Sequence, residues 1–209
     1  MEEIKEKVVK ITPLSRHSMG YASIENPDTH SQIFFVSLAI QSRKKIMKFK
    51  IEQATKNDLE SILSLNQDSM PALSSSSLDV MKYFLIICDY FKVCKINGEI
   101  IGFLNAIMPS KDYNSEHYQW FNDKYKSFIY VDRITFNKSY QNQGYGRIFY
   151  NDLIDSIKNT SLNIVCEINT NPYNNQSIQF HEKYGFTKVG SKEINVNKSV
   201  VYMMYKRAQ

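Results

Sequence analysis

The chain has 209 residues, of which 43% are hydrophobic and 22% charged, which is enough apolar material for one sizeable core. Its 14 Tyr, 12 Phe and 1 Trp are too many aromatic residues for a disordered chain, and the longest apolar runs, 33–40 and 84–88, are shorter than the ~20 residues that a membrane span needs. The 26 Lys and Arg against 21 Asp and Glu give a net charge of +5, which suits an anionic ligand. Because there is no run of five or six cations, we expect no nucleic-acid partner. Because the apolar runs are short, we expect no membrane partner.

Cysteine and glycine usage narrows the class of protein further. Cys88, Cys94 and Cys166 lie in apolar stretches without CxxC or any other metal-ligand spacing. Three such residues are typical of buried free thiols in a reducing compartment, so we expect a cytoplasmic protein without a metal site. The chain has only 7 glycines, about half of the usual ~7% share. Each glycine therefore marks a position where the backbone needs its freedom.

The first 46 residues differ from the rest. They show no sustained helical period, and they end in a basic cluster at 43–45. We interpret 1–46 as an N-terminal extension that is loosely ordered or docked on the surface. The alternative is that Met47 is the natural start and the upstream residues are a tail of little consequence. Residues 47–209 are predicted to form one domain.

Several local signals define the elements of the first half of this domain. Thr55 and Asp58 have the spacing of a helix start, and the serines 74–77 precede a second helix. The pair Asn97-Gly98 is a strong hairpin signal. In chain order, these signals predict a strand at 49–54, helices at 56–65 and 78–91, and strands at 93–96 and 100–107.

The second half opens with an interruption at 109–126, where aromatic and acidic residues alternate. The elements that follow are predicted to be a strand at 128–136, a helix at 144–158, a strand at 162–168, a helix at 176–184, and strands at 186–189 and 200–205. This order favours an α/β fold with a central mixed sheet of six to seven strands and helices on both faces.

The sharpest local motif is the run 141–147, which joins a strand to an amphipathic helix. Gly144 and Gly146 remove Cβ atoms where the backbone bends, so an anion can approach the peptide N–H groups at the start of the helix. Arg147 adds a positive charge to the first turn. The motif predicts a pyrophosphate site. The alternative is a loop whose glycines serve only for turning.

A second motif follows at the expected distance. The stretch 174–186 begins with Asn, continues as a helix and ends in Gly-Phe. Together with Gln-x-x-Gly-x-Gly at 141–146, it resembles the GNAT superfamily of acyl-CoA N-acyltransferases. The resemblance covers roughly 47–207. It is closest to a bacterial branch that has a Tyr-Val-Asp-Arg-Ile strand, present here from Tyr130.

The resemblance implies a GNAT-type sheet in which a splayed strand pair holds acetyl-CoA as cosubstrate, without a metal. The main chain of 134–136 would contact pantetheine, the amides of 142–147 would hold the pyrophosphate, and Asn174 would bond to the cofactor arm. Ser177 would contact the arm or merely cap its helix. The expected cofactor-binding residues are Ile134, Thr135, Phe136, Gln141, Asn142, Gln143, Gly144, Tyr145, Gly146, Arg147, Asn174 and Ser177.

The implied chemistry is direct attack of an amine on the thioester, which needs a deprotonated amine and a proton donor for the leaving thiolate. Family members often supply the donor from a Tyr in the helix that ends Gly-Phe, but this chain has His181 there. His181 would donate a proton if cationic. The alternative is a partly buried helix histidine bonded to the backbone.

Asp132 and Glu167 are the two candidates for the base. Asp132 shares one strand face with Tyr130 by the period-2 rule, and it would take a proton or hold a cationic amine. The alternative is that Asp132 forms a structural pair with Arg133. Glu167, on the neighbouring strand, is the second candidate. Proximity alone could also make a dedicated base unnecessary.

The acceptor is expected to lie against the interruption at 111–126. Its aromatic residues Tyr113, Tyr118 and Trp120, interleaved with carboxylates, suit a lid over a small amine with a flat or apolar body. The alternative is a surface helix whose aromatics only fix it to the sheet. We therefore expect an N-acetyltransferase that acts on a primary amine of a small molecule or peptide. A homodimer is compatible with this expectation. The alternative is a non-catalytic acyl-CoA-binding regulatory module.

Overall fold

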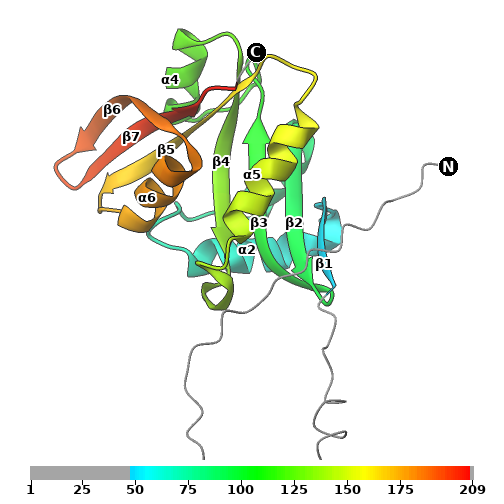
Figure 1. Ribbon diagram of the computed structural model, residues 1–209. Helices are drawn as coiled ribbons and strands as arrows, with labels where there is room; N and C mark the ends of the chain where they lie inside the picture. Colours follow the sequence, from blue (N-terminus) through cyan, green and yellow to red (C-terminus); the bar gives the residue numbers. More distant parts are fainter. Residues whose placement is uncertain (1–47, 208–209) are drawn as a thin grey trace, which may run out of the picture. The chain divides into compact units, whose positions relative to one another are not determined.

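A computed structural model describes residues 48–207, so the predicted extension 1–46 lies outside the described residues. The described chain forms a seven-stranded sheet in the order β1-β2-β3-β4-β5-β7-β6 (Figure 1). The strands are β1 (Phe49–Gln53), β2 (Tyr90–Ile96), β3 (Glu99–Ile107), β4 (Phe128–Phe136), β5 (Asn163–Asn171), β6 (Thr187–Asn195) and β7 (Lys198–Tyr205). The helices are η1 (Lys56–Asp58), α2 (Leu59–Asp68), α3 (Leu78–Ile87), α4 (Glu116–Lys124), η2 (Lys138–Tyr140), α5 (Tyr145–Ser156) and α6 (Asn175–Tyr184). The predicted mixed α/β fold is confirmed.

The most consequential feature of the sheet is the pair β4 and β5. These parallel strands pair only at their first residues, the last matched pair being Tyr130 with Val165. Beyond this pair no register joins the two strands. Neighbouring strands β3 and β7 continue their antiparallel pairing alongside. The sheet is thus splayed in its centre, as the family resemblance implies.

Helices cover both faces of the sheet (Figure 1). On one face, α2 and α3 pack a core around Ile62, Met81 and Phe84. The aromatic side chains of α4 extend this layer over β4, β5 and β7. The other face carries α5 and α6, which lie in front of β4 and β5 in Figure 1. Each face therefore has its own apolar layer, and the splay between β4 and β5 lies between these layers.

The local start and turn signals form as predicted. Thr55 and Asp58 make a capping box at the start of η1, and the Ser77 hydroxyl accepts a hydrogen bond from a helix N–H at the start of α3. Asn97 and Gly98 both have positive φ angles, 53° and 90°, which match a tight hairpin turn. The short-range chemistry of these residues is sufficient to place them.

The predicted end of the second helix is wrong, because α3 ends at Ile87 and not at Phe91. Asp89 donates its N–H to the Ala106 carbonyl at 3.1 Å, and its side chain accepts from the Met108 N–H at 2.8 Å. These long-range bonds to the end of β3 draw the chain out of the helix. The apolar residues that follow therefore enter β2 instead of extending α3.

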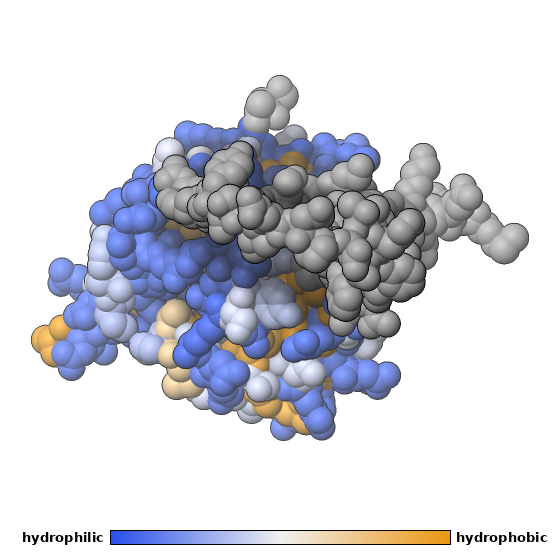
Figure 2. Space-filling model, turned by 60° about the horizontal axis from the view of Figure 1, so that its bottom comes forward, coloured by the Kyte–Doolittle hydropathy of each residue, from blue (hydrophilic) through white to orange (hydrophobic). Residues whose placement is uncertain are grey.

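The surface of the described domain is mainly polar on the face in Figure 2, with small hydrophobic patches toward its lower edge. The most exposed large apolar side chains are Val196, Ile86 and Tyr173. Within 48–207, no helix has the length and apolar character needed to cross a lipid bilayer.

Candidate active site

A cavity of about 690 Å³ lies at the splay between β4 and β5. Its walls come from both diverging strands, from the α2–α3 loop, and from the segment that leads into α4. The turn before α5 and the first part of α6 complete it. The cavity is therefore lined from both faces of the sheet, so ligands from the two sides can meet at the gap between the strands.

The glycine turn before α5 forms one end of this cavity. Gly144 has a φ of 87°, a left-handed conformation that favours glycine, and it immediately precedes α5. A Cβ atom on Gly144 would meet no atom within 4 Å, so the space in front of this turn is open. The first N–H groups of a helix have no intrahelical acceptor and carry the positive end of its dipole. The turn can therefore receive an anion.

Gly146 has a different reason to be glycine. A Cβ atom there would lie 2.9 Å from the ring of Phe180 on α6. The residue thus allows close packing of α5 against α6, which the sequence analysis did not foresee. Both glycines of the motif are needed, one for the turn and one for the contact between helices.

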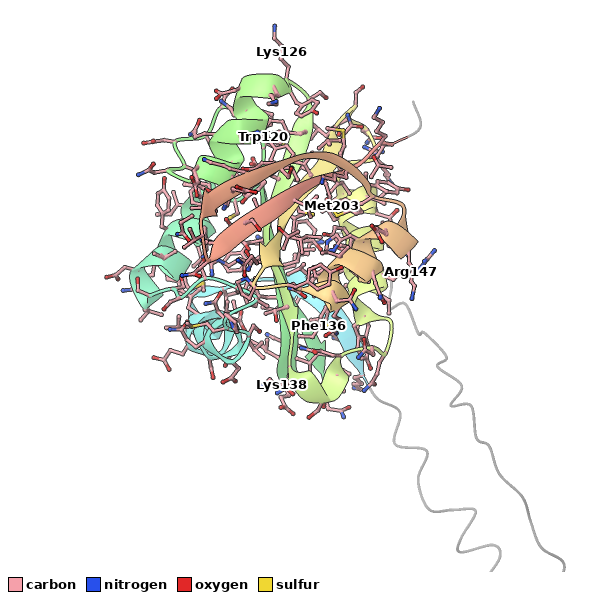
Figure 3. All side chains as sticks on the ribbon, turned by 90° about the vertical axis from the view of Figure 1, so that its left-hand side faces the viewer. Trp120, Lys126, Phe136, Lys138, Arg147 and Met203 are labelled. Carbon is pink, nitrogen blue, oxygen red and sulfur yellow. The ribbon has the colours of Figure 1, made fainter. Side chains whose placement is uncertain are left out.

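Most predicted cofactor residues line the cavity, and two do not. Ile134, Thr135 and Phe136 line it from β4, and Gln141, Asn142, Gly144, Tyr145 and Gly146 line it from the turn. Gln143 instead donates a hydrogen bond to the Ser139 carbonyl at 2.8 Å. The Arg147 guanidinium lies over the Tyr184 ring, 5.5 Å from its centre. In Figure 3, Phe136 and Lys138 mark the lower end of β4, and Arg147 lies to their right.

Asn174 and Ser177 line the cavity from α6. Asn174 is the cap of this helix, since its side-chain oxygen accepts from the Ser177 N–H at 3.1 Å. The alternative that Ser177 caps the helix is therefore wrong. With its oxygen engaged, Asn174 has its side-chain NH₂ group to offer a ligand.

Asp132 is held by three partners. One carboxylate oxygen accepts from the Tyr113 hydroxyl at 2.6 Å, and the other accepts from Arg133 at 3.1 Å and from Asn105 at 3.5 Å. Arg133 also donates to Asn66 and Ser74, which ties β4 to α2 and its following loop. The structural pair with Arg133, predicted as the alternative, is what forms, and a free catalytic base at Asp132 does not fit these contacts.

A β-bulge explains how neighbouring residues can bond to each other. The register between β3 and β4 pairs Asn105 with Arg133 and Ala106 with Val131, so Asp132 is the extra residue. Strict alternation would send Asp132 and Arg133 to opposite faces. The bulge instead brings both side chains into one network.

The second carboxylate of interest in the cavity is Glu167, which is hydrogen-bonded to Tyr130. The Tyr130 hydroxyl donates to the Glu167 carboxylate at 2.8 Å. Burial and the nearby Asp132 carboxylate raise the pKa of Glu167 to about 7. Burial also raises the pKa of Tyr130, which keeps its hydroxyl protonated. Near neutral pH, Glu167 can therefore both accept and release a proton at the splay.

Of the three aromatic residues predicted to contact an acceptor, only Tyr113 lines the cavity. Tyr118 is fully buried and donates its hydroxyl to the Met108 carbonyl at 2.8 Å. The Trp120 ring stacks on Tyr202 with the ring centres 4.0 Å apart. Figure 3 shows Trp120 on α4, far from Phe136 at the opposite end of β4. For Tyr118 and Trp120 the alternative interpretation fits better, because they fix the helix to the sheet.

Some cavity residues escaped the sequence analysis. Asn169 on β5 donates to the Ala72 carbonyl at 3.2 Å, and Ser69 lies 2.5 Å from the Thr135 hydroxyl on β4. The α2–α3 loop is thus joined to both splayed strands. His117 and Lys198 line the acceptor side. No local sequence signal marks Asn169, Ser69, His117 or Lys198, because the place of each at the cavity depends on segments far apart in the chain.

The thiols and metal-ligand candidates also have defined places. Cys94 and Cys166 are buried free thiols, and Cys88 is partly buried. Within residues 48–207, no group of three or more His, Cys, Asp or Glu side chains is arranged to hold a metal ion.

Comparison with known proteins identifies the family. The family model described as "Acetyltransferase (GNAT) family" matches residues 47–186. The chain belongs to the GNAT acetyltransferase family. No curated protein matched the sequence of this GNAT chain.

Solved GNAT structures share the fold at low sequence identity. Ard1 from Thermoplasma volcanium aligns with a TM-score of 0.63 at 14% identity, covering 77% of this chain and 99% of that one. The ribosomal-protein-S18-alanine N-acetyltransferase from Escherichia coli has a TM-score of 0.59 at 15% identity, with 76% and 93% covered. Arabidopsis thaliana Naa50, solved with the bisubstrate analogue CoA-Ac-MVNAL, has a TM-score of 0.60 at 14% identity, with 76% and 99% covered.

His181 lies at the position where the resemblance implies a proton-donating tyrosine. The side chain is buried, with Nε2 at 2.8 Å from the Tyr150 hydroxyl and Nδ1 at 2.7 Å from the Ser177 carbonyl. Burial lowers the pKa of His181 to about 4. These bonds suit a neutral ring that donates to Ser177 and accepts from Tyr150. The cationic donor considered for His181 is therefore wrong at neutral pH, and the alternative of a structural histidine fits.

We expect His181 to make the GNAT domain sensitive to acid. Between pH 6.5 and about 4 the unfolded chain binds a proton at this position that the folded chain does not, so stability falls as the pH falls. In His181→Gln the loss of unfolding free energy between pH 7 and pH 4.5 should be smaller, by on the order of 2 kcal/mol. Urea unfolding of both proteins at the two pH values measures this difference. Equal pH dependence of the two would contradict a buried neutral His181.

Proposed function

We propose that this GNAT chain transfers an acetyl group from acetyl-CoA to a primary amine by direct attack. The observation that carries the proposal is the placement of Glu167 and Tyr130 at the splay, in the same cavity as the glycine turn. Glu167, with its pKa raised to about 7, is a candidate base between the cofactor side and the acceptor side of the cavity. Both requirements of the reaction, a diphosphate site and a proton acceptor, are thus supported within one cavity.

The residues present fit acetyl-CoA. The open space before Gly144 suits a diphosphate. Residues 134–136 of β4 pair with β3 but not with β5, so their β5 side suits an extended arm that bonds like an added strand. Asn174 offers its NH₂ group from the other side. Lys138 and Lys183 also line the cavity and supply positive charge. When bound, acetyl-CoA supplies the activated thioester.

The chain's own groups handle the proton. Glu167 takes a proton from the ammonium or from the attacking amine while the nitrogen–carbon bond forms and the carbon–sulfur bond breaks. Tyr130 holds the carboxylate in place through its 2.8 Å hydrogen bond. Because His181 is neutral and already bonded, it does not protonate the leaving sulfur, which would depart as the thiolate of coenzyme A. Positioning of the amine beside the thioester supplies much of the remaining acceleration.

A thiol-release assay with acetyl-CoA and a panel of primary amines tests the proposal. We expect release of coenzyme A that depends on the amine and yields a stoichiometric amount of N-acetyl product. Tight acetyl-CoA binding without turnover on any amine would contradict it. That result would favour the second candidate, a non-catalytic acyl-CoA-binding module, for which the absence of the family tyrosine at His181 is the supporting observation.

A further inference from the structure

Lys198 places a positive charge on the acceptor side of the cavity. Lys198, the first residue of β7, lines the cavity, and among residues 48–207 it has no carboxylate within ion-pair distance. The nearest acidic residue on α4, Glu116, is already paired with Lys192 at 2.7 Å. The Asp132 carboxylate is likewise paired with Arg133. Lys198 therefore has its charge available to a ligand.

Lys198 lies on the same face of β7 as Tyr202, and Tyr202 is the residue that pairs with Glu167 on β5. Glu167 pairs with Tyr202 across the β5–β7 ladder, and residues 198, 200 and 202 share a face by strand alternation. Four residues of strand place the Lys198 Cα about 13 Å from Tyr202. A strand side chain stands roughly perpendicular to the sheet and only leans along the strand, so Lys198 covers part of this distance. An amine and a carboxylate joined by a short carbon chain, each hydrogen-bonded at its end, suit the rest.

Polar groups complete the wall between these two charges. His117 lines the cavity, and its Nδ1 lies 3.2 Å from the Tyr202 hydroxyl. Ser115, at the start of α4, lines the same wall. Asp68 also lines the cavity, but it ends α2 next to Ser69, which contacts Thr135 toward the cofactor side. Glu116 is the carboxylate that feels the Lys198 charge, but its bonded partner is Lys192, so the Lys198 ammonium can still bind a ligand anion.

We propose that the acceptor is an amine with a carboxylate on a nearby carbon, of the α-amino acid type, and that Lys198 binds this carboxylate. This inference rests on the proposed function, because it assigns the amine to Glu167. The amine nitrogen faces Glu167 and Tyr130, while the carboxylate lies toward Lys198 and the start of α4. Tyr113 and the α2–α3 loop enclose the side chain of the acceptor.

The test compares free L-amino acids with their α-carboxamides as acceptors in the presence of acetyl-CoA. The α-carboxamide has nearly the same size but lacks the negative charge. Its α-amine is also a weaker base, so the two acceptors are compared at equal concentrations of free amine. For the best amino acid, we expect the wild-type kcat/KM to exceed that of its amide by about tenfold or more, the value of a hydrogen bond to a charged group. In Lys198→Gln the ratio should fall toward one, mainly through a higher KM for the acid. In Lys198→Glu the amide should become the better acceptor.

Lys188→Gln is the matched control, because Lys188 is an exposed lysine on β6 that does not line the cavity. Its acid-to-amide ratio should equal that of the wild type. A wild-type ratio near one would overturn the inference while leaving acetyl transfer intact. The inference would also be overturned if a tripeptide with the same first residue were acetylated about tenfold better than the free amino acid. If other primary amines are acetylated but no amino acid is, the inference fails and the proposed function stands. If acetyl-CoA binds but no amine of any kind is acetylated, both fail.

Discussion

Replacing Glu167 with glutamine should lower kcat by roughly 10²- to 10³-fold, the usual contribution of a positioned general base. The amide keeps the shape of the side chain and can still accept the hydrogen bond from Tyr130, but it cannot take a proton. Binding of acetyl-CoA should change little, because Glu167 lies at the junction of the cavity and not at the glycine turn. Steady-state thiol release and calorimetric titration of acetyl-CoA measure the two effects separately.

The pH profile gives this prediction its specific signature. Because burial and Asp132 raise the pKa of Glu167 to about 7, the fraction of ionised base rises as the pH rises through 7. The wild-type kcat should therefore show an inflection near pH 7, and this inflection should be absent in Glu167→Gln, whose rate follows only the fraction of free amine. Glu193→Gln, at an exposed position on β6 outside the cavity, should behave as the wild type. Retention of wild-type kcat and pH profile in Glu167→Gln would exclude Glu167 as the base.

Replacing Gly144 with valine should weaken acetyl-CoA binding by about 100-fold. The φ of 87° disfavours a β-branched residue, and the new side chain would occupy the open space in front of the helix start. The loss should be specific to the diphosphate, so calorimetric titration with pantetheine should give the same result for variant and wild type.

Gly98 offers a matched control for the backbone effect. It has a φ of 90° and no neighbour within 4 Å of a Cβ position, but it lies in the β2–β3 hairpin and does not line the cavity. Gly98→Val should therefore carry a similar conformational cost without loss of acetyl-CoA affinity. If Gly144→Val binds acetyl-CoA as tightly as Gly98→Val does, the glycine turn is not the diphosphate site.

Features that depend on a short stretch of chain were predictable from the sequence. Gly144 is needed by a single turn, and Asn97-Gly98 by a single hairpin, so the residue types alone indicate both. The strands of the sheet were also recognisable, although β6 runs to Asn195, well beyond the predicted 186–189. Its polar, exposed residues carry little apolar alternation, and its pairing with β7 defines it.

Features that depend on long-range contacts were not predictable in this way. The role of Asp132 was decided by a bulge opposite Asn105 and by Arg133 reaching Asn66 and Ser74, none of which leaves a mark in the local pattern. The position of Lys198 at the cavity depends on the pairing of β7 with β5. Sequence alone could thus indicate Glu167 as a candidate, but only the fold separates it from Asp132.

The resemblance to the family was informative about the cofactor side and less so about the proton donor. Residues of β4, the glycine turn and Asn174 line one cavity, as the resemblance implied. His181 occupies the donor position of the family, but its burial and its bonds to Tyr150 and Ser177 make it part of the core. A substitution within a motif therefore has to be judged from its surroundings.

A crystal structure of the chain with coenzyme A tests the central claim most directly. We predict density for the diphosphate against the backbone of Gly144 to Gly146, the pantetheine arm along 134–136 of β4, and the sulfur in the gap between β4 and β5, beside Glu167. Coenzyme A bound outside the splay, or with its sulfur on the far side of the sheet from Glu167, would contradict the account.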